Sequence, residues 1–424
     1  MRRDLEVDGA VVASCTRPTR THLTACGIAL VALAVSALLL AAVAERAEAR
    51  ARGGLTFVLE GQRARGLAMQ RAALADRNVL MLYGASELAR PVPLRAQEFF
   101  ASAPTGFRAF SVGERGTPLL MNLQSIVALG EALRGRRVAI FLTIDAFLHA
   151  SSRSALDSAQ VAAFRGTFSM LHAAATLFSP TLSAELKREI AKRLVRVAPL
   201  FDGSPLLGAA VRLLADPTPL HRIEYALLYP FGRLMVHALE MQDHAVVLGN
   251  LTLGGVVVPS AEQTPRPVDW EQLRSEGDAM ARRASTNNPY GYESGFYERQ
   301  VLPKREAHRN SRPDSVFLAE LREAAVWDTL ELLIRALREH GATPLFVCSP
   351  FKGVYADFKG TSPAARSTVY AAIRDYARRQ QIALVTFEAY DADPYFLVDQ
   401  SHPSPKGWAI YNEALDAFVH DRLD

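Results

Sequence analysis

The chain has 424 residues, a length that fits one large α/β domain with an insertion, or two or three smaller domains. Its 49% hydrophobic and 22% charged residues exclude a disordered or collagen-like chain, and its 3 cysteines are too few for a disulfide scaffold. The net charge of +4 is not gathered into Lys/Arg blocks with interleaved aromatic residues, so we predict no nucleic-acid binding.

The first predicted element is a membrane helix at residues 23–44. This uncharged segment would span roughly 33 Å at about 1.5 Å per residue, enough to cross a hydrocarbon core. We predict a signal-anchor in contact with membrane lipid, with residues 1–22 in the cytoplasm and the remainder outside the cytoplasm. The alternative is a signal peptide that is cleaved after Ala42-Val43-Ala44.

After the membrane helix, the sequence predicts a stem and an α/β domain. Residues 45–77 are rich in Ala, Arg and Glu and are expected to form a helical stem. Within residues 78–424, short apolar runs alternate with helical patterns, which predicts a parallel sheet covered by helices on both faces. From about 150 to 320 helical stretches and prolines predominate and predict a large, mostly helical insertion. The predicted strands are 78–83, 108–112, 138–144, 344–349 and 382–387.

Ser86 is the first candidate catalytic residue. It lies in Gly84-Ala85-Ser86-Glu87-Leu88, directly after the first predicted strand. A serine at this place projects from the carboxyl edge of a parallel sheet, where the backbone N–H groups of the turn point at a bound group. The alternative is that Ser86 only caps the following helix.

Asp399-Gln400-Ser401-His402 is the second candidate, and it precedes the last predicted helix. A carboxylate three residues before a histidine can accept the ring Nδ1–H, which fixes the tautomer and leaves Nε2 as a base. The alternative is an exposed loop histidine, with Asp399 or Ser404 serving as a cap.

The combination of these two motifs resembles the layout of SGNH-type esterases. The turn at Gly84 to Leu88 is similar to the G-S-S-E-L turn of the DltD family, the D-alanyl-lipoteichoic acid biosynthesis proteins. The departures are Ala85 in place of a serine, Pro403 after the histidine, and Ile144-Asp145-Ala146-Phe147 where the family tends to have Ser-Pro and an aromatic residue. Four further features resemble the family, and together they cover the chain from about residue 24 to the end. They are the membrane helix, the segment Asn287-Asn288-Pro289-Tyr290 followed by Phe296-Tyr297, the strand ending at Pro350 followed by Lys352 to Asp357, and Lys406-Gly407-Trp408.

The resemblance implies a three-layer SGNH-like fold and a Ser-His-Asp triad. Ser86 would be the nucleophile, His402 its base and Asp399 the residue that orients the histidine. We expect the oxyanion hole to use the Ser86 N–H and the turn from Gly113 to Gly116, although these glycines would also suit a turn without any catalytic role. The predicted acceptor-binding residues, for which turns and caps are the alternative role, are Asn287, Asn288, Tyr290 and Tyr355.

The implied reaction is D-alanyl transfer to a hydroxyl of a cell-envelope glycopolymer, of teichoic acid or lipopolysaccharide type. By resemblance, the partners are a membrane-bound O-acyltransferase and an acyl-carrier system, and no metal or other cofactor is predicted. Two alternatives remain open. One is an O-acetyl esterase or O-acetyltransferase that acts on an exported polysaccharide, and the other is a non-catalytic, membrane-tethered scaffold.

Overall fold

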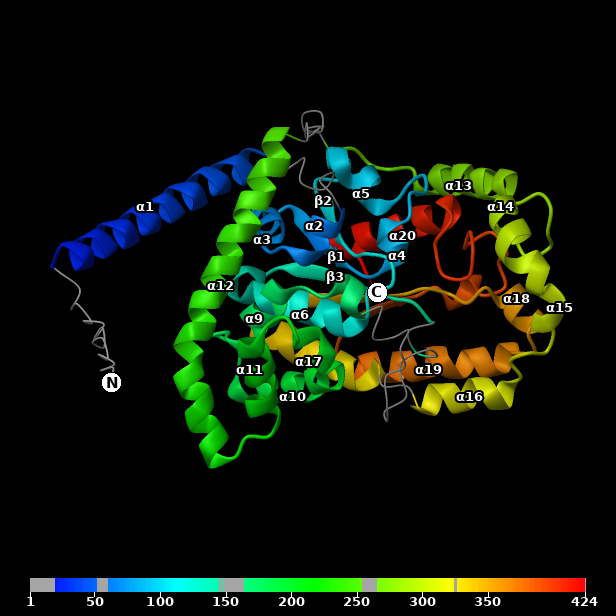
Figure 1. Cartoon of the computed structure of the whole chain (residues 1–424). Coiled ribbons are helices and arrows are strands. Elements are labelled where there is room, and N and C mark those ends of the chain that lie inside the picture. The colour runs from blue at the N-terminus through cyan, green and yellow to red at the C-terminus, as the bar shows by residue number, and fades with distance from the viewer. Residues whose placement is uncertain are drawn as a thin grey trace, which may run out of the picture.

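Five parallel strands form one sheet at the centre of the protein (Figure 1). The computed structural model describes residues 20–51, 60–144, 147, 164–253, 265–323 and 326–423. The strand order is β2-β1-β3-β4-β5, and Met81 of the central region pairs with Phe110 on one side and Val138 on the other. All five predicted strands are present, so the predicted parallel α/β sheet is confirmed. The strands are β1 (Val79–Tyr83), β2 (Arg108–Val112), β3 (Arg137–Leu142), β4 (Thr343–Cys348) and β5 (Ala383–Thr386).

Helices cover both faces of this sheet, because successive strand residues point to opposite sides. Met81, Ile140 and Phe346 belong to the larger core, whereas their neighbours Leu82 and Phe141 belong to the smaller one. The helices on the larger core are α3 (Ala68–Leu74), α6 (Leu119–Leu129), α9 (Met170–Leu177), α10 (Ala184–Leu194), α11 (Pro205–Ala215), α17 (Val326–Glu339) and α19 (Pro363–Arg379). The smaller core is covered by α5 (Ala96–Phe99) and α20 (Pro405–Val419), with α13 (Trp270–Ala284) packed against α20.

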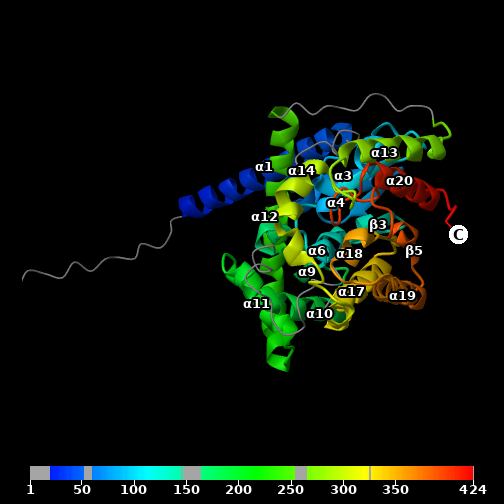
Figure 2. The ribbon, with the colours of Figure 1, turned by 90° about the vertical axis from the view of Figure 1, so that its right-hand side faces the viewer.

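The connection from β3 to β4 is mostly helical in the residues that the structure describes. It carries α9 to α17, including the long helix α12 (Pro219–Leu253), which runs along one side of the domain (Figures 1 and 2). The remaining helices are α2 (Glu60–Arg65), α4 (Ser86–Ala89), α14 (Ser294–Phe296), α15 (Arg305–His308), α16 (Asp314–Glu323) and α18 (Gly353–Phe358).

The predicted apolar helix near the N-terminus is present as α1 (Arg20–Ala51). Its apolar part is not buried by the rest of the chain, and it is long and apolar enough to cross a membrane. Helix α1 projects away from the domain (Figure 1). The residues expected to form a stem include the end of α1, α2 and α3, and α3 packs into the larger core through Leu67, Ala68 and Met69.

Candidate active site

Ser86 is the first residue of α4 and follows the carboxyl end of β1, the position expected from the sequence. The turn before it is closely packed. The Gly84 N–H donates to the carbonyl of Val112 at 3.1 Å, and the Asn122 amide donates to the Gly84 carbonyl at 3.0 Å. A Cβ on Gly84 would lie 2.3 Å from Glu87 Oε1 and 3.1 Å from Phe141 Cβ, so only glycine fits there.

Glu87 fixes the same turn from the other side. Its buried carboxylate accepts the N–H of Ala85 at 2.7 Å. Burial raises the pKa of Glu87, while the Ala85 and Glu87 N–H groups and the charge of His402 counteract this rise. Glu87 therefore holds the turn that carries Ser86.

His402 is held by Asp399 in the way that the motif predicts. The distances from His402 Nδ1 to Asp399 Oδ1 and Oδ2 are 2.8 and 2.7 Å. Asp399 Oδ1 also accepts the N–H groups of Ser401 and His402, at 3.0 and 2.9 Å. Burial alone would raise the pKa of Asp399, but the hydrogen bond and charge of His402, the Ser401 N–H and the charge of Arg90 hold it below the ordinary value. The carboxylate is therefore kept ionised beside the imidazole.

Arg90 connects the two halves of the candidate triad. It follows α4, and its N–H donates to the Ser86 carbonyl at 2.9 Å. Its guanidinium is bonded to Asp399 and lies 3.6 Å from Glu293. Among the described residues, the Ser86 hydroxyl makes no hydrogen bond, so the serine–histidine contact stays a prediction; such contacts often tighten only when substrate binds.

The two glycines predicted for the oxyanion hole differ in their surroundings. Gly113 is buried, and a Cβ there would lie 2.7 Å from the Ala85 carbonyl oxygen and 3.2 Å from the Gly84 carbonyl carbon. Gly113 therefore lies against the backbone of the Ser86 turn. Gly116 is exposed, has a φ of +73°, and has no atom within 4 Å of the place of a Cβ. The oxyanion role of either glycine stays a prediction.

Replacing Gly113 by alanine is expected to lower the rate of ester cleavage by about 10²-fold, the effect of losing one oxyanion-hole donor. The new methyl group would push the Ala85 carbonyl, and with it the Ser86 N–H, out of position. The matched control is Gly135→Ala outside the site, which meets no neighbour but strains a positive φ of +67° and should cost about 1 kcal/mol of stability with little loss of rate. Rates and melting temperatures of both variants measure the difference; equal rates would contradict the role of Gly113.

The predicted acceptor-binding residues form two different kinds of structure. The Asn288 side chain accepts the N–H groups of Tyr290 and Tyr292 at 3.1 and 3.0 Å, and Asn287 donates to Glu298 at 2.8 Å. These are the bonds of a stabilised turn. Their role in acceptor binding stays a prediction.

Tyr290 and Tyr355 meet in an aromatic cluster that this turn supports. Their rings are 5.0 Å apart in an edge-to-face arrangement, and Tyr292 packs against the same Tyr355 ring at 5.2 Å. The Tyr355 hydroxyl is bonded to His308 Nδ1 at 2.7 Å. The turn at residues 287–292 and helix α18 are thus joined beside the loop that carries the Asp399–His402 pair.

Lys352 is a buried cation that holds these loops together. Its ammonium donates to the carbonyls of Gly291 at 2.9 Å and Pro394 at 2.6 Å, and also to that of Leu397. Burial lowers the pKa of Lys352 to about 7, and the charges of Asp399 and Asp393 oppose this change. Lys352 therefore positions the segment that leads into Asp399.

A cavity of about 50 Å³ opens beside this lysine. Its lining includes Lys352, Arg312, Tyr355 and Gln400, and Gln400 is part of the loop between Asp399 and His402. The cavity therefore adjoins the candidate triad and combines cationic with aromatic groups. Within the described part of the chain, no cluster of three or more His, Cys, Asp or Glu side chains is arranged to hold a metal ion.

Replacing Lys352 by methionine is expected to destabilise the protein by about 2–4 kcal/mol at neutral pH, because buried carbonyls lose their donor. The pKa of Lys352 is about 7 in the folded protein and 10.5 in the unfolded chain. Between pH 7 and 10.5, the unfolded chain therefore binds more protons at this lysine than the folded protein does. The stability of the wild type relative to the variant should therefore increase as pH rises from 7 towards 10. Denaturant unfolding at several pH values measures this.

The control for this prediction is Lys192→Met. Lys192 is half-exposed and, among the residues that the structure describes, pairs with Glu189 on the same helix, so its loss should change stability by less than about 0.5 kcal/mol. A Lys352 variant that is no less stable than this control would contradict the positioning role.

Sequence reasoning did not identify Arg90, Glu293 or Lys352 as members of the site. The sequence marks the segment from Lys352 to Asp357 only by a short family similarity, and Arg90 is one of many arginines in the chain. Each acts through a partner that is more than 40 residues away in the sequence (Asp399 for Arg90, Gly291 and Leu397 for Lys352). Such pairs carry no local signal in a single sequence.

Comparison with known proteins finds one family over most of the chain. The family model described as "DltD protein" matches residues 57–420. Protein DltD of Bacillus subtilis (strain 168) is 23% identical over 355 residues, covering 83% of this chain and 85% of that protein. Protein DltD of Staphylococcus aureus (strain NCTC 8325 / PS 47) is 20% identical, with 84% and 85% covered. Protein DltD of Lacticaseibacillus rhamnosus is 22% identical, with 84% and 80% covered.

Proposed function

Because this chain belongs to the DltD family, we propose that it is a serine acyltransferase or esterase that moves D-alanyl groups onto a cell-envelope polymer. The observation that supports the proposal most strongly is that the Asp399–His402 motif and the turn that carries Ser86 are linked through Arg90. Asp399 holds the His402 ring at 2.7 Å, and Arg90 ties Asp399 to the helix that begins with Ser86. Family membership supports D-alanyl as the acyl group.

In the proposed mechanism, the Ser86 hydroxyl attacks the carbonyl carbon of an activated acyl donor while His402 Nε2 takes its proton. The developing oxyanion is held by the Ser86 N–H and by an N–H at the Gly113 turn. His402 then returns the proton to the leaving group. In the second half, His402 removes a proton from the acceptor hydroxyl, which attacks the acyl-serine ester; the ester bond to Ser86 breaks, and His402 gives the proton to Ser86 Oγ.

The cavity beside Gln400 is the proposed approach for the acceptor. Lys352, Arg312 and Tyr355 line it, and such a mixture of polar and aromatic groups suits a hydroxyl-bearing polymer. Asn287 and Asn288 would shape this approach by holding the turn that carries Tyr290 and Tyr292.

The proposed location is the outer face of a membrane, with α1 as a single-pass anchor and the α/β domain outside the cytoplasm. A membrane-bound O-acyltransferase and an acyl-carrier system would supply the D-alanyl group. The length and composition of α1 support an anchor, and a signal sequence would have the same features. The size of the mature protein in the membrane fraction distinguishes these two cases.

The function is tested by measuring ester-linked groups on the envelope polymers of a deletion strain. We expect mass spectrometry to find less ester-linked D-alanine, which wild-type protein restores and the Ser86→Ala variant does not. Loss of acetyl esters instead would indicate an O-acetyl esterase or O-acetyltransferase. Full restoration by Ser86→Ala would indicate a non-catalytic scaffold and contradict the proposal.

A further inference from the structure

The outer face of α12 is apolar, although this helix lies on the surface of the domain. We call the five residues Leu220, Ile223, Leu227, Phe231 and Leu234 the apolar stripe; each is between 61% and 69% exposed. Their spacing of three or four residues places them on one side of the helix. In a surface helix of a protein in water, the apolar face normally packs against the protein core.

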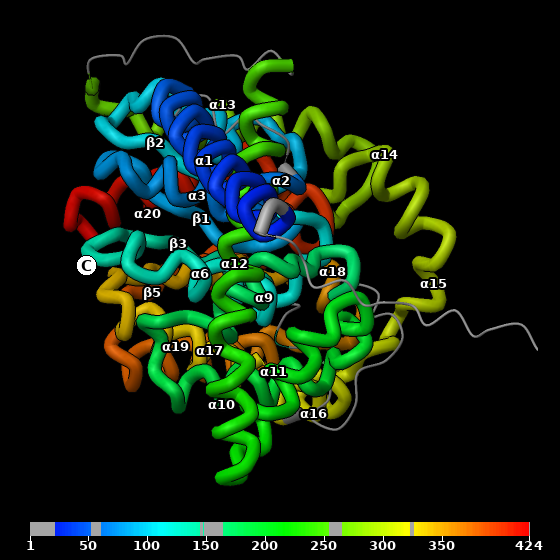
Figure 3. Tube along the Cα trace, turned by 60° about the vertical axis from the view of Figure 1, so that its left-hand side comes forward, coloured from blue at the N-terminus to red at the C-terminus, as the bar shows by residue number. Residues whose placement is uncertain are grey.

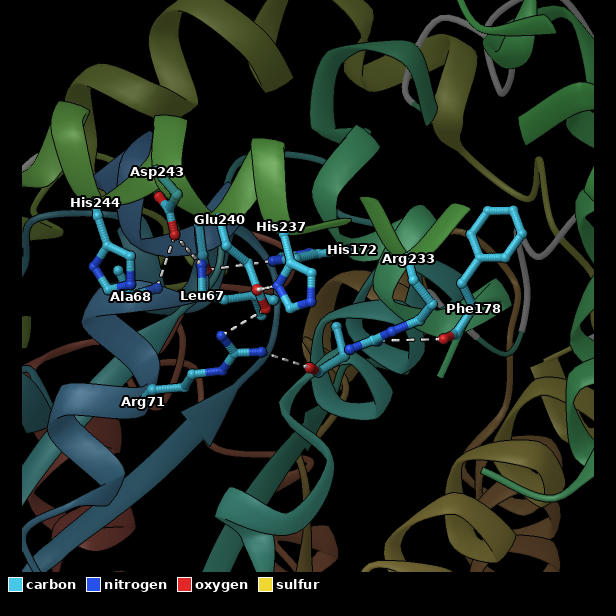
Figure 4. Close-up of polar contacts among 12 residues, drawn as sticks. Leu67, Ala68, Arg71, His172, Phe178, Arg233, His237, Glu240, Asp243 and His244 are labelled. Carbon is cyan, nitrogen blue, oxygen red and sulfur yellow. Dashed lines mark hydrogen bonds and ion pairs between the residues drawn. The ribbon is translucent and has the colours of Figure 1, made fainter. Parts of the chain in front are cut away.

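Asp243, Glu240 and His244 of α12 point in the opposite direction, toward the domain (Figure 4), whereas the uncharged Gln242 and the His237 ring are exposed. Asp243 accepts the N–H groups of Leu67 and Ala68 at 2.7 and 2.8 Å. Glu240 forms an ion pair with Arg71 at 2.8 Å. Exposed charged side chains on this fully described helix are confined to Arg222 and Glu224, close to its first turn. The amphipathic pattern is therefore the reverse of that of a helix exposed to water.

The rotation of α12 about its axis is fixed, so the stripe cannot simply turn inward. A Cβ on Gly232 would lie 2.2 Å from the ring of Phe178, which shows that the helix backbone is pressed against α9. Tyr225 donates its hydroxyl hydrogen to the Leu177 carbonyl from the same inner side. Turning the stripe toward the core would break these contacts and expose Asp243 and Glu240.

The stripe lies on the same side of the domain as α1. Glu48, near the end of α1, is bonded to His244 of α12 at 2.8 Å, and Ala44 and Glu48 are buried. The apolar part of α1 before this contact is exposed. Figure 3 shows α1 coming forward from the face of the domain down which α12 runs. A bilayer that α1 enters would thus meet this face.

We propose that α12 lies in the plane of the membrane interface, with its apolar stripe in contact with phospholipid. The occupant is a bilayer because the apolar surface of α1 and the stripe share one side, and because an outward apolar face with inward charges suits the headgroup–acyl boundary. Helices α14 and α18, beside the candidate triad, lie on the opposite side of the domain (Figures 1 and 2). The site would therefore open away from the bilayer. This inference rests only on the membrane placement in the proposed function.

The test uses the full chain in phosphatidylcholine–phosphatidylglycerol nanodiscs. Cys15→Ser and Cys26→Ser leave Cys348, which is buried. A bimane probe is attached to a single new cysteine at Leu227, Phe231 or Leu234, and the matched control is a cysteine at Leu302, which is 49% exposed and lies outside α12. Quenching is measured with lipids that carry a shallow doxyl group and with iodide in the water.

We expect doxyl lipids to quench the stripe probes about two-fold or more relative to the Leu302 probe, and iodide to show the reverse order. Adding Leu227→Glu to the Phe231 probe should remove the lipid quenching. Equal iodide quenching at the stripe and at Leu302 would overturn the proposal, as would protection from both quenchers, which would indicate a protein partner. Covalent labelling of Ser86 is measured separately, so failure of the catalytic proposal leaves this result unaffected.

Discussion

The Ser86→Ala variant is expected to lose covalent labelling by a fluorophosphonate probe and to hydrolyse a p-nitrophenyl ester about 10³- to 10⁶-fold more slowly than the wild type. This expectation follows from the proposed mechanism, in which the Ser86 hydroxyl at the carboxyl end of β1 forms the acyl bond. The residual rate would come from the oxyanion hole and from binding alone. Full-length protein in detergent or nanodiscs is used for both assays.

A matched serine variant separates chemistry from folding. Ser367 is exposed on α19, so Ser367→Ala should keep labelling, rate and melting temperature. Ser86 is half-buried and its hydroxyl makes no hydrogen bond to a described residue, so Ser86→Ala should also melt like the wild type. Wild-type labelling in the Ser86 variant would show that the probe reacts at another residue.

The Asp399→Asn variant is expected to lower the rate by about 10³- to 10⁴-fold, although it keeps the loop. The amide oxygen of asparagine can still accept the N–H groups of Ser401 and His402. It cannot carry the negative charge that stabilises the imidazolium, and the amide nitrogen disfavours the tautomer with Nδ1–H. The reduction should appear in kcat and not in KM, because Asp399 acts through His402.

Stability measurements add a second readout for Asp399. Its folded pKa is lowered, so its ionised form stabilises the protein above the ordinary carboxyl pKa, and this contribution is lost as pH falls through the folded pKa. The difference in melting temperature between wild type and Asp399→Asn should therefore shrink in acid. The control is Asp375→Asn on the exposed side of α19, where the pair with Arg378 is solvated. An Asp399 variant that is as active as this control would contradict the triad.

The sheet and the positions of the two candidate motifs were predictable because each depends on a short stretch of sequence. Apolar runs such as 78–83 and 344–349 have the length of buried strands, and all five strands occur where the runs are. Ser86 follows a strand directly, and Asp399 is only three residues from His402. Local spacing was therefore enough to place both motifs at the same edge of the sheet.

The contacts that join these motifs were not predictable, because they connect distant parts of the chain. Arg90 reaches Asp399, and Lys352 reaches carbonyls on two separate loops. Contacts between distant residues also fix which face of α12 points toward the domain: Glu240 pairs with Arg71, and Asp243 accepts the backbone N–H of Leu67. The periodic pattern of α12 shows that one face is apolar but cannot show that this face points outward.

The most direct test of the central claim is mass spectrometry of the peptide that contains Ser86 after incubation with a D-alanyl thioester donor. The full-length wild type is incubated without acceptor polymer, so that the acyl group is not passed on, and the His402→Gln variant, which lacks the base for both steps, should stay unacylated. We expect the mass of the Ser86 peptide to increase by one D-alanyl group, trapped by acid quenching and absent in Ser86→Ala. D-alanyl transfer to the polymer without any acyl group on Ser86, or with the acyl group on another residue, would contradict it.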